Sequence, residues 1–279
     1  MTNKEFYIGW QDHAPEGIAT KTRKTILMLV GLATVAGAVF IFGQRQFSNS
    51  TFELGHLRTL EGVLFTDPIP SLKILAGKDA AGQNQFQRVL LVGFGKHSAL
   101  PTLEAIQQAQ GQEIDGKGVR LEGQLIYYDG LLAMELTKGE AAFKGFTDAN
   151  LQDYFTLPKD LGSAILQGEI MDPKCYLGAM RPAEGKPHRS CAIRCIEGGI
   201  PPLFRSATAD DQRQYFFLLG YDGRAINGEI AGYMADDILF CGRMEKWDDW
   251  LIVKMDTGKG IHRTNPWWKK DTSIPMCGS

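Results

Sequence analysis

The sequence lacks the concentration of basic charge that nucleic-acid binding requires. Lys and Arg number 30 and Asp and Glu number 32, so the net charge is −2, and the two signs are mixed along the chain. A surface that binds nucleic acid needs clustered Lys and Arg to neutralise phosphates. We therefore expect no nucleic-acid partner.

Signatures of hydrolysis and of nucleotide binding are also missing. The chain has no HExxH helix, no paired-carboxylate pattern and no Ser–His–Asp order. A strand followed by Gly93-x-Gly95 imitates a dinucleotide-binding turn, but Ser98 occupies the third glycine position and no βαβ alternation follows. His56 and His97 have no potential ligand partner near them in sequence. We predict no catalytic residues and no nucleotide cofactor.

Charged residues are absent from the run Thr25–Gly43, TILMLVGLATVAGAVFIFG. At about 1.5 Å per residue, a helix of this length spans roughly the 30 Å hydrocarbon core of a bilayer. A cleaved signal peptide is the alternative. However, the run is longer than a usual signal-peptide core, a long segment precedes it, and no clear A-x-A site follows it. We predict an uncleaved, single-pass transmembrane helix.

The charges that flank this run indicate its orientation. Lys21, Arg23 and Lys24 precede it closely, whereas only Arg45 follows it closely. Positive charge stays on the cytoplasmic side, so we expect the N-terminus inside and the C-terminal body in the periplasm, anchored to the inner membrane. The expected partners are the lipid bilayer and a protein of a membrane complex.

The body contains a repeated pattern. Three pairs of segments match in the same order: 62–68 with 168–173, 88–93 with 215–220, and 121–136 with 240–255. The third segment of each copy has apolar runs on either side of a turn, Asp129-Gly130 or Asp248-Asp249, which is typical of a β-hairpin. A short helix is predicted before each hairpin, over 103–110 and about 227–234.

Each copy therefore has the order strand, strand, helix and hairpin, which resembles an OB-like small barrel. We predict a mostly β chain with minor α+β character, in which an N-terminal transmembrane helix precedes two tandem OB-like barrels. The expected segments are a cytoplasmic segment (1–24), the transmembrane helix (25–43), a first OB-like domain (52–146), a second (160–258) and a C-terminal tail (259–279).

The second copy carries an insertion. The interval from Gly168 to Gly220 is 21 residues longer than the corresponding interval from Gly62 to Gly93. The added segment follows Asp172, and it contains three of the five cysteines of the chain, whereas the first copy contains none.

The potential ligands of the insertion are Cys175, His188, Cys191 and Cys195. The stretch CAIRC is predicted to form a helical turn with Ser190 as its N-cap. On such a helix Cys191 and Cys195 are four residues apart and share one face. His188 can approach that face from the preceding loop.

Three interpretations of these residues are open. A Cys₃His set suits zinc or copper(I), with Asp172 supporting the ligands from outside. A structural disulfide from Cys175 to Cys191 or Cys195 is typical of an oxidising compartment. The third interpretation is a redox-active dithiol at a helix N-terminus. A fourth cysteine, Cys241, is expected to be buried.

The stretch G-E-I-x-D-x-K-C-Y…H-x-x-C-A-x-x-C-x-x-G-G-I-P-P resembles a motif of uncharacterised, membrane-anchored bacterial proteins. The resemblance covers roughly 35 residues and brings no assigned activity. It implies that Asp172, Cys175, His188, Cys191 and Cys195 act as one unit.

Two functions follow from these expectations. The first is a membrane-tethered periplasmic protein whose second domain carries a Cys/His site for metal handling or electron-transfer support. The alternative is a non-catalytic accessory or assembly subunit of a membrane complex, with disulfide-stapled OB-like domains as binding surfaces. Stoichiometric zinc or copper distinguishes the first from the second.

Overall fold

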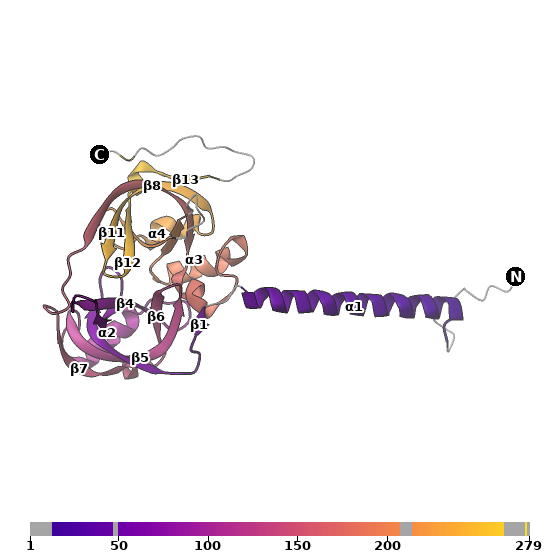
Figure 1. The fold of residues 1–279 in the computed structure, drawn as a ribbon, viewed down its shortest axis with the longest axis horizontal. Coiled ribbons are helices and arrows are strands. Elements are labelled where there is room, and N and C mark those ends of the chain that lie inside the picture. Colours follow the sequence, from indigo (N-terminus) through magenta and orange to yellow (C-terminus); the bar gives the residue numbers. More distant parts are fainter. Residues whose placement is uncertain (1–12, 47–49, 207–213, 265–276, 278–279) are drawn as a thin grey trace. The chain divides into compact units, whose positions relative to one another are not determined.

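The computed structural model describes residues 13–46, 50–206, 214–264 and 277 (Figure 1). It divides into an N-terminal unit, Met1–Asn49, and a body, Ser50–Ser279. Parts of two expected segments, residues 1–12 of the N-terminal segment and residues 265–276 and 278–279 of the tail, lie outside the described residues.

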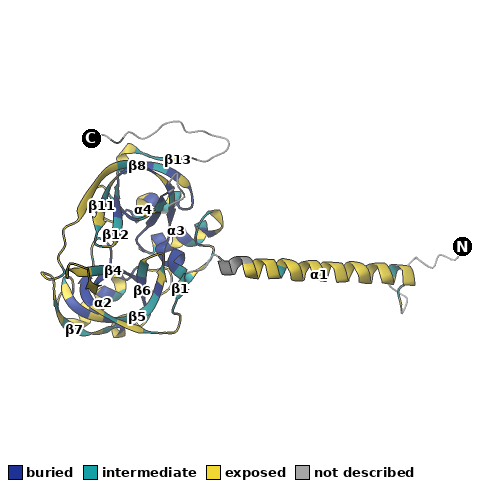
Figure 2. Ribbon diagram, in the orientation of Figure 1, coloured by how far each residue is buried: buried dark blue, intermediate teal, exposed yellow. Residues whose placement is uncertain are grey.

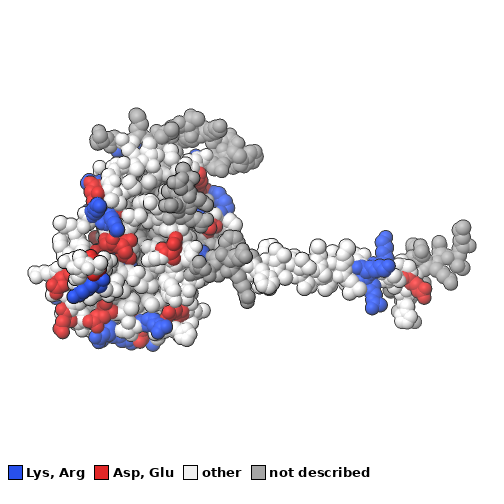
Figure 3. Space-filling view, viewed as in Figure 1, with Lys and Arg blue, Asp and Glu red and all other residues white. Residues whose placement is uncertain are grey.

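The N-terminal unit contains one long helix, α1 (Glu16–Gln46). It begins directly after Pro15, and no proline interrupts it, so its backbone hydrogen bonds run without a break. The part Glu16–Phe42 is long and apolar enough to cross a membrane, and its side chains are almost all exposed (Figure 2). Figure 3 shows Lys and Arg gathered at one end of this helix and an uncharged surface along the rest of its visible part. An N-terminal apolar helix of this kind fits a membrane anchor or a signal sequence.

The first half of the body is a five-stranded barrel with two additional strands. Its strands are β1 (Thr51–Phe52), β2 (Arg58–Phe65), β3 (Ser71–Lys78), β4 (Asn84–Gly93), β5 (Lys117–Tyr128), β6 (Leu131–Leu136) and β7 (Phe143–Asn150). The hydrogen-bonded order is β5-β2-β3-β4-β6, and the pairing of β5 with β6 closes the circle. β4 and β6 are parallel, and the helix α2 (Leu100–Gln110) lies between β4 and β5 in sequence.

The second half repeats this topology. Its strands are β8 (Lys159–Met171), β9 (Leu203–Ser206), β10 (Gln214–Gly220), β11 (Asp237–Trp247), β12 (Trp250–Met255) and β13 (Ile261–Arg263). The order is β12-β10-β9-β8-β11, β12 also pairs with β11, and β10 and β12 are parallel. The helix α4 (Asn227–Ile230) and the 3₁₀ turn η4 (Ala231–Tyr233) precede β11. Two closed barrels with this strand order and a helix after the third strand are OB-like, which confirms the predicted fold class.

Close backbone approaches explain the glycines that the two copies share. A Cβ atom on Gly62 would lie 2.2 Å from the carbonyl oxygen of Lys73, and one on Gly168 would lie 1.9 Å from that of Arg205. Both distances are impossible for real atoms, so only glycine fits where the first and second strands of each barrel cross.

The predicted hairpins are also confirmed. β5 and β6 pair on either side of Asp129-Gly130, and β11 and β12 pair on either side of Asp248-Asp249. Asp129 and Asp248 both have positive φ, 52° and 57°, a conformation that Asp and Asn tolerate better than most residues.

The insertion lies between the first two strands of the second barrel. It contains a π-helical turn, η2 (Cys175–Ala179), a 3₁₀ turn, η3 (Lys186–His188), and the helix α3 (Arg189–Glu197). The prediction that Ser190 caps this helix is wrong. η3 runs directly into α3, so the helix begins at Arg189 and the N-cap position is His188, without a side-chain hydrogen bond.

The two barrels share a buried apolar seam. Each barrel has a core of its own, and a further cluster combines residues of both. Leu90, Val92 and Ile126 of the first barrel belong to this cluster together with Met171 and Trp250 of the second. Burial of apolar surface is the main favourable term in folding, so the seam makes the body one cooperative structure.

A group of buried charges also joins the barrels. Asp248, in the β11–β12 turn, accepts hydrogen bonds from Lys73 Nζ at 2.8 Å and Arg88 Nε at 2.7 Å. Thr156, in the connection between the barrels, donates to the same carboxylate at 2.6 Å. The side chains of Lys73 and Asp248 are only 1% and 4% exposed.

The pKa values of these groups reflect their burial. Burial alone would raise the pKa of Asp248, but hydrogen bonds from Lys73 and Thr156 and the charge of Arg88 outweigh it and hold the pKa below its ordinary value. Burial lowers the pKa of Lys73, and the Asp248 carboxylate offsets only part of this effect.

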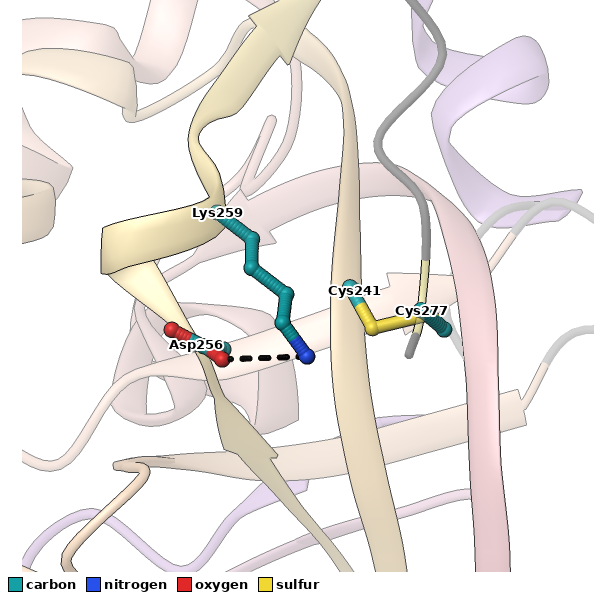
Figure 4. Close-up of a disulfide and its surroundings, with 4 residues drawn as sticks. All are labelled: Cys241, Asp256, Lys259 and Cys277. Carbon is teal, nitrogen blue, oxygen red and sulfur yellow. Dashed lines mark ion pairs between the residues drawn. A yellow bond between two sulfur atoms is a disulfide. The ribbon is translucent and has the colours of Figure 1, made fainter. Parts of the chain in front are cut away.

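The C-terminal end of the chain is attached to the second barrel by a disulfide (Figure 4). Cys277 is bonded to Cys241 in β11, with their Cα atoms 5.4 Å apart. Cys241 is buried, as predicted, but no pattern in the sequence indicates its pairing with Cys277. A disulfide is typical of proteins in oxidising compartments.

Asp248→Asn should destabilise the body by about 3 kcal/mol at neutral pH, because it leaves the buried Lys73 ammonium without its counter-charge. Asn tolerates positive φ, so the turn itself is preserved. Urea unfolding of the full-length protein in detergent, followed by tryptophan fluorescence, measures the effect.

The pKa of Asp248 is lower in the folded protein than in the unfolded chain, where it is about 4. Its contribution to the free energy of unfolding is therefore complete above a pH of about 4 and is lost as the pH falls through the lower, folded pKa. The difference between the two proteins should therefore shrink on acidification. Asp160→Asn is the control, because the ion pair of Asp160 with Arg243 is about half exposed and its loss should change stability little. Equal losses of stability from the two substitutions would contradict a stabilising role of the buried Asp248–Lys73 pair.

Candidate metal centre

Two elements of the insertion bring its cysteines together. Cys175 is the first residue of η2, four residues after the last residue of β8, and Cys191 and Cys195 lie four residues apart on one face of α3. Cys175 and Cys195 belong to the buried cluster of the seam, and Cys191 packs against it. The packing of both elements into the seam therefore fixes the relative positions of the three sulfurs.

A buried carboxylate completes this group. One ligand atom each from Asp172, Cys175, Cys191 and Cys195 lies within 4.8 Å of all the others. Cys175 Sγ and Cys191 Sγ are 3.9 Å apart. Ligands at about 2.3 Å from a tetrahedral ion are separated from one another by roughly 3.8 Å, so the four atoms need only small movements to coordinate one ion. Asp172, Cys175 and Cys195 are buried, and Cys191 is partly exposed.

His188 is not one of these four residues, although the sequence suggested it as a ligand. It is buried, and its Nε2 lies 3.7 Å from Oδ2 of Asp172. The structure thus places Asp172 beside the sulfurs and His188 behind Asp172. A histidine in this position can orient a coordinating carboxylate.

Two atoms facing each other at this point have no hydrogen bond. Among the described residues, Asp172 Oδ2 and His188 Nε2 are buried and without a hydrogen-bond partner. Buried polar atoms are almost always paired, because leaving one unpaired costs about 1–3 kcal/mol. A cation bound by Asp172 and the sulfurs would satisfy the carboxylate oxygen, so the residues fit a metal ion.

The other oxygen of Asp172 is fixed by the backbone. Oδ1 accepts hydrogen bonds from the N–H groups of Lys174 at 2.9 Å and Cys175 at 3.3 Å. Burial alone would raise the pKa of Asp172, but the facing His188, the neighbouring Cys175 and Cys195 side chains and the backbone N–H of Cys175 outweigh it and lower the pKa. The carboxylate is therefore ionised and ready to bind a cation.

The Cys175 thiol beside this carboxylate is held in its neutral form when no ion is bound. The hydrogen bond with Cys195, burial, and the negative charge of Asp172 all raise the pKa of Cys175. A metal ion must displace the thiol proton to bind Cys175. The raised pKa means that this exchange requires an ion with high affinity for thiolate, or a high pH.

The first barrel supports the site from the opposite side of the seam. The Lys174 ammonium crosses into that barrel, where it donates to Glu135 Oε1 at 2.5 Å and to the carbonyl of Gly93 at 2.8 Å. Lys96, in the loop after Gly93, donates to Cys191 Sγ at 3.0 Å, and this hydrogen bond raises the pKa of Lys96.

Sequence reasoning missed these first-barrel residues, because no local pattern connects them with the insertion. Their partner in the insertion, Lys174, does have a sequence signal, since it lies between Asp172 and Cys175 in the motif. His56 and His97 are exposed. Gly93 is the last residue of β4, in keeping with a strand-end glycine.

The comparisons with known proteins give little. The chain is similar to the crystal structure of a deletion mutant of the single-stranded DNA binding protein from Thermus aquaticus, with 13% identity, over 80% of this chain and 98% of that chain. The TM-score is 0.20, so this likeness carries no argument about function. No family model and no curated protein matches the chain.

The exposures of the five cysteines predict the order in which they react. In metal-free, non-reduced protein, iodoacetamide should label the partly exposed Cys191 first, and Cys175 and Cys195 only after unfolding. Cys241 and Cys277 should be labelled only after reduction. Peptide mass spectrometry at increasing times measures the order. Labelling of Cys195 before Cys191, or of Cys277 without reductant, would contradict this geometry.

Proposed function

We propose that this chain is a membrane-tethered protein that binds a soft metal ion, zinc or copper(I), between its two barrels. The observation that carries the proposal is the convergence of three sulfurs and one carboxylate oxygen of Asp172 within 4.8 Å, where three of the four residues are buried. Thiolate ligands favour zinc and copper(I) over magnesium and calcium, which prefer oxygen.

The charges around the group support a cation at this position. Three thiolates and the Asp172 carboxylate would carry four negative charges, which cannot be buried together without compensation. A bound ion supplies most of it. Lys96 beside Cys191 supplies further positive charge.

The tether and its orientation are part of the proposal. α1 would cross the inner membrane with Lys21, Arg23 and Lys24 on the cytoplasmic side, and the body would lie in the periplasm. The Cys241–Cys277 disulfide supports an oxidising compartment for the body. In such a compartment three adjacent thiols stay reduced when an ion occupies them, and this is a second reason to favour coordination.

Such a site suits a role in metal handling or in support of electron transfer, for a partner protein in the same membrane. The protein's own residues would hold the ion, exclude water on the buried side and leave Cys191 accessible. The alternative is an accessory subunit in which Cys175 is disulfide-bonded to Cys191 or Cys195; the sulfur separation of 3.9 Å between Cys175 and Cys191 makes that bond reachable after a small movement.

Metal analysis of the full-length protein tests the proposal. Purified anaerobically in detergent, it should contain one zinc or copper ion per chain. Cys195→Ser removes a buried ligand and should lower the affinity on the order of 100-fold. The double substitution Cys241→Ser and Cys277→Ser, which also removes two cysteines, is the matched control and should retain the ion. A metal-free protein with Cys175 oxidised to Cys191 or Cys195 would favour the alternative.

The orientation is tested separately in spheroplasts. Protease added from outside should degrade the body but leave an epitope fused to the N-terminus intact. A protected body would reverse the orientation, and a mature chain that begins after residue 43 would identify α1 as a cleaved signal sequence.

A further inference from the structure

An exposed methionine lies beside the metal centre. Met180 follows η2 directly, and its Sδ is 3.7 Å from Cys191 Sγ. The residue is 47% exposed. Its thioether is therefore available at the side of the site that faces solvent.

The sulfur atoms form a continuous path from the surface to the interior. Cys191 Sγ is 3.7 Å from Met180 Sδ on the exposed side and 3.9 Å from Cys175 Sγ on the buried side. These separations are close to those of ligands sharing one ion, roughly 3.8 Å. Cys191 is the only partly exposed residue of the group that Asp172 and the three cysteines form. It is close enough to share an ion with Met180 on one side and with Cys175 on the other.

Lys96 also contacts Cys191. Its ammonium is 3.0 Å from Cys191 Sγ and has no lone pair to offer, so it cannot be a ligand of the ion. Met180 Sδ, by contrast, can donate a lone pair to an ion that is bound by Cys191.

The chemistry of the thioether distinguishes between the two candidate ions. A thioether is a soft, neutral donor that selects copper(I), whereas zinc sites use thiolate, imidazole and carboxylate ligands. For zinc, the set of Asp172 and the three cysteines is already complete, and Met180 would add nothing. For copper(I), Met180 would replace a hard carboxylate with a fourth sulfur and would not increase the negative charge.

We infer, on the basis of the proposed function, that the ion is copper(I) and that Met180 is its thioether ligand at the exposed side of the site. Copper(I) would first contact Met180 and Cys191 and then Cys175.

The substitution Met180→Leu tests this inference, because leucine keeps a similar volume and removes the sulfur. Copper(I) affinity of the reduced, full-length protein is measured by competition with bicinchoninate, and zinc affinity by competition with a chromogenic chelator. We expect Met180→Leu to weaken copper(I) binding by about tenfold or more and to leave zinc binding unchanged. Met180→Gln, of similar length, should behave in the same way.

Met244→Leu is the matched control, since Met244 is a partly buried methionine of β11 that packs against the second-barrel core and should affect neither ion. If Met180→Leu binds copper(I) as tightly as the unaltered protein, the inference is overturned while the proposed function stands. If both affinities fall equally, Met180 acts through packing, and the inference is again overturned. If the unaltered protein binds neither ion, the proposed function itself fails.

Discussion

The Lys174 ammonium holds the candidate site in its place. Lys174 belongs to the insertion of the second barrel, yet its charge is neutralised in the first barrel by Glu135 and by backbone carbonyls. A buried ammonium is tolerated only with such partners, so the insertion can adopt its observed path only against an intact first barrel. Cys175, the next residue, is thereby placed within reach of Cys191.

The apolar seam between the barrels also holds the candidate site in place. Cys175 and Cys195 belong to the same buried cluster as Leu90 and Ile126 of the first barrel. The site is therefore a property of the pair of barrels, because one copy carries the ligands and the other provides the surface against which they are arranged. Lys96, which contacts Cys191 from the first barrel, illustrates the same dependence.

The sequence predicted the fold better than the site. Matches at Gly62 and Gly168, and at the Asp129 and Asp248 turns, reflect local steric demands, and such demands repeat whenever a fold repeats. The apolar helix was equally plain, because a long uncharged run has few alternatives. The start of α3 was misplaced, since the 3₁₀ turn before Arg189 supplies the first turn that a cap at Ser190 would otherwise begin.

The members of the candidate site were recognisable as a group, but their arrangement was not. The spacing of Cys191 and Cys195 revealed one shared helix face. The positions of Asp172 beside the sulfurs and of His188 behind it depend on how β8 ends and how η3 turns, and no periodicity encodes these. Lys96, Glu135 and Met180 lie near the site only because of tertiary contacts, which the local sequence does not reveal. The pairing of Cys241 with Cys277 is of the same kind, because connectivity between cysteines cannot be deduced from spacing.

The position of the insertion has a consequence for how such a protein can change. Both barrels keep their five strands, and all of the added chemistry lies in the connection between β8 and β9. Substitutions there can alter ligand identity without disturbing the strand pairing that maintains the fold. The first barrel, by contrast, is under two constraints: its own strands must close, and its surface must fit the insertion of the second barrel. The barrel without the insertion can therefore tolerate fewer substitutions than the barrel that carries it.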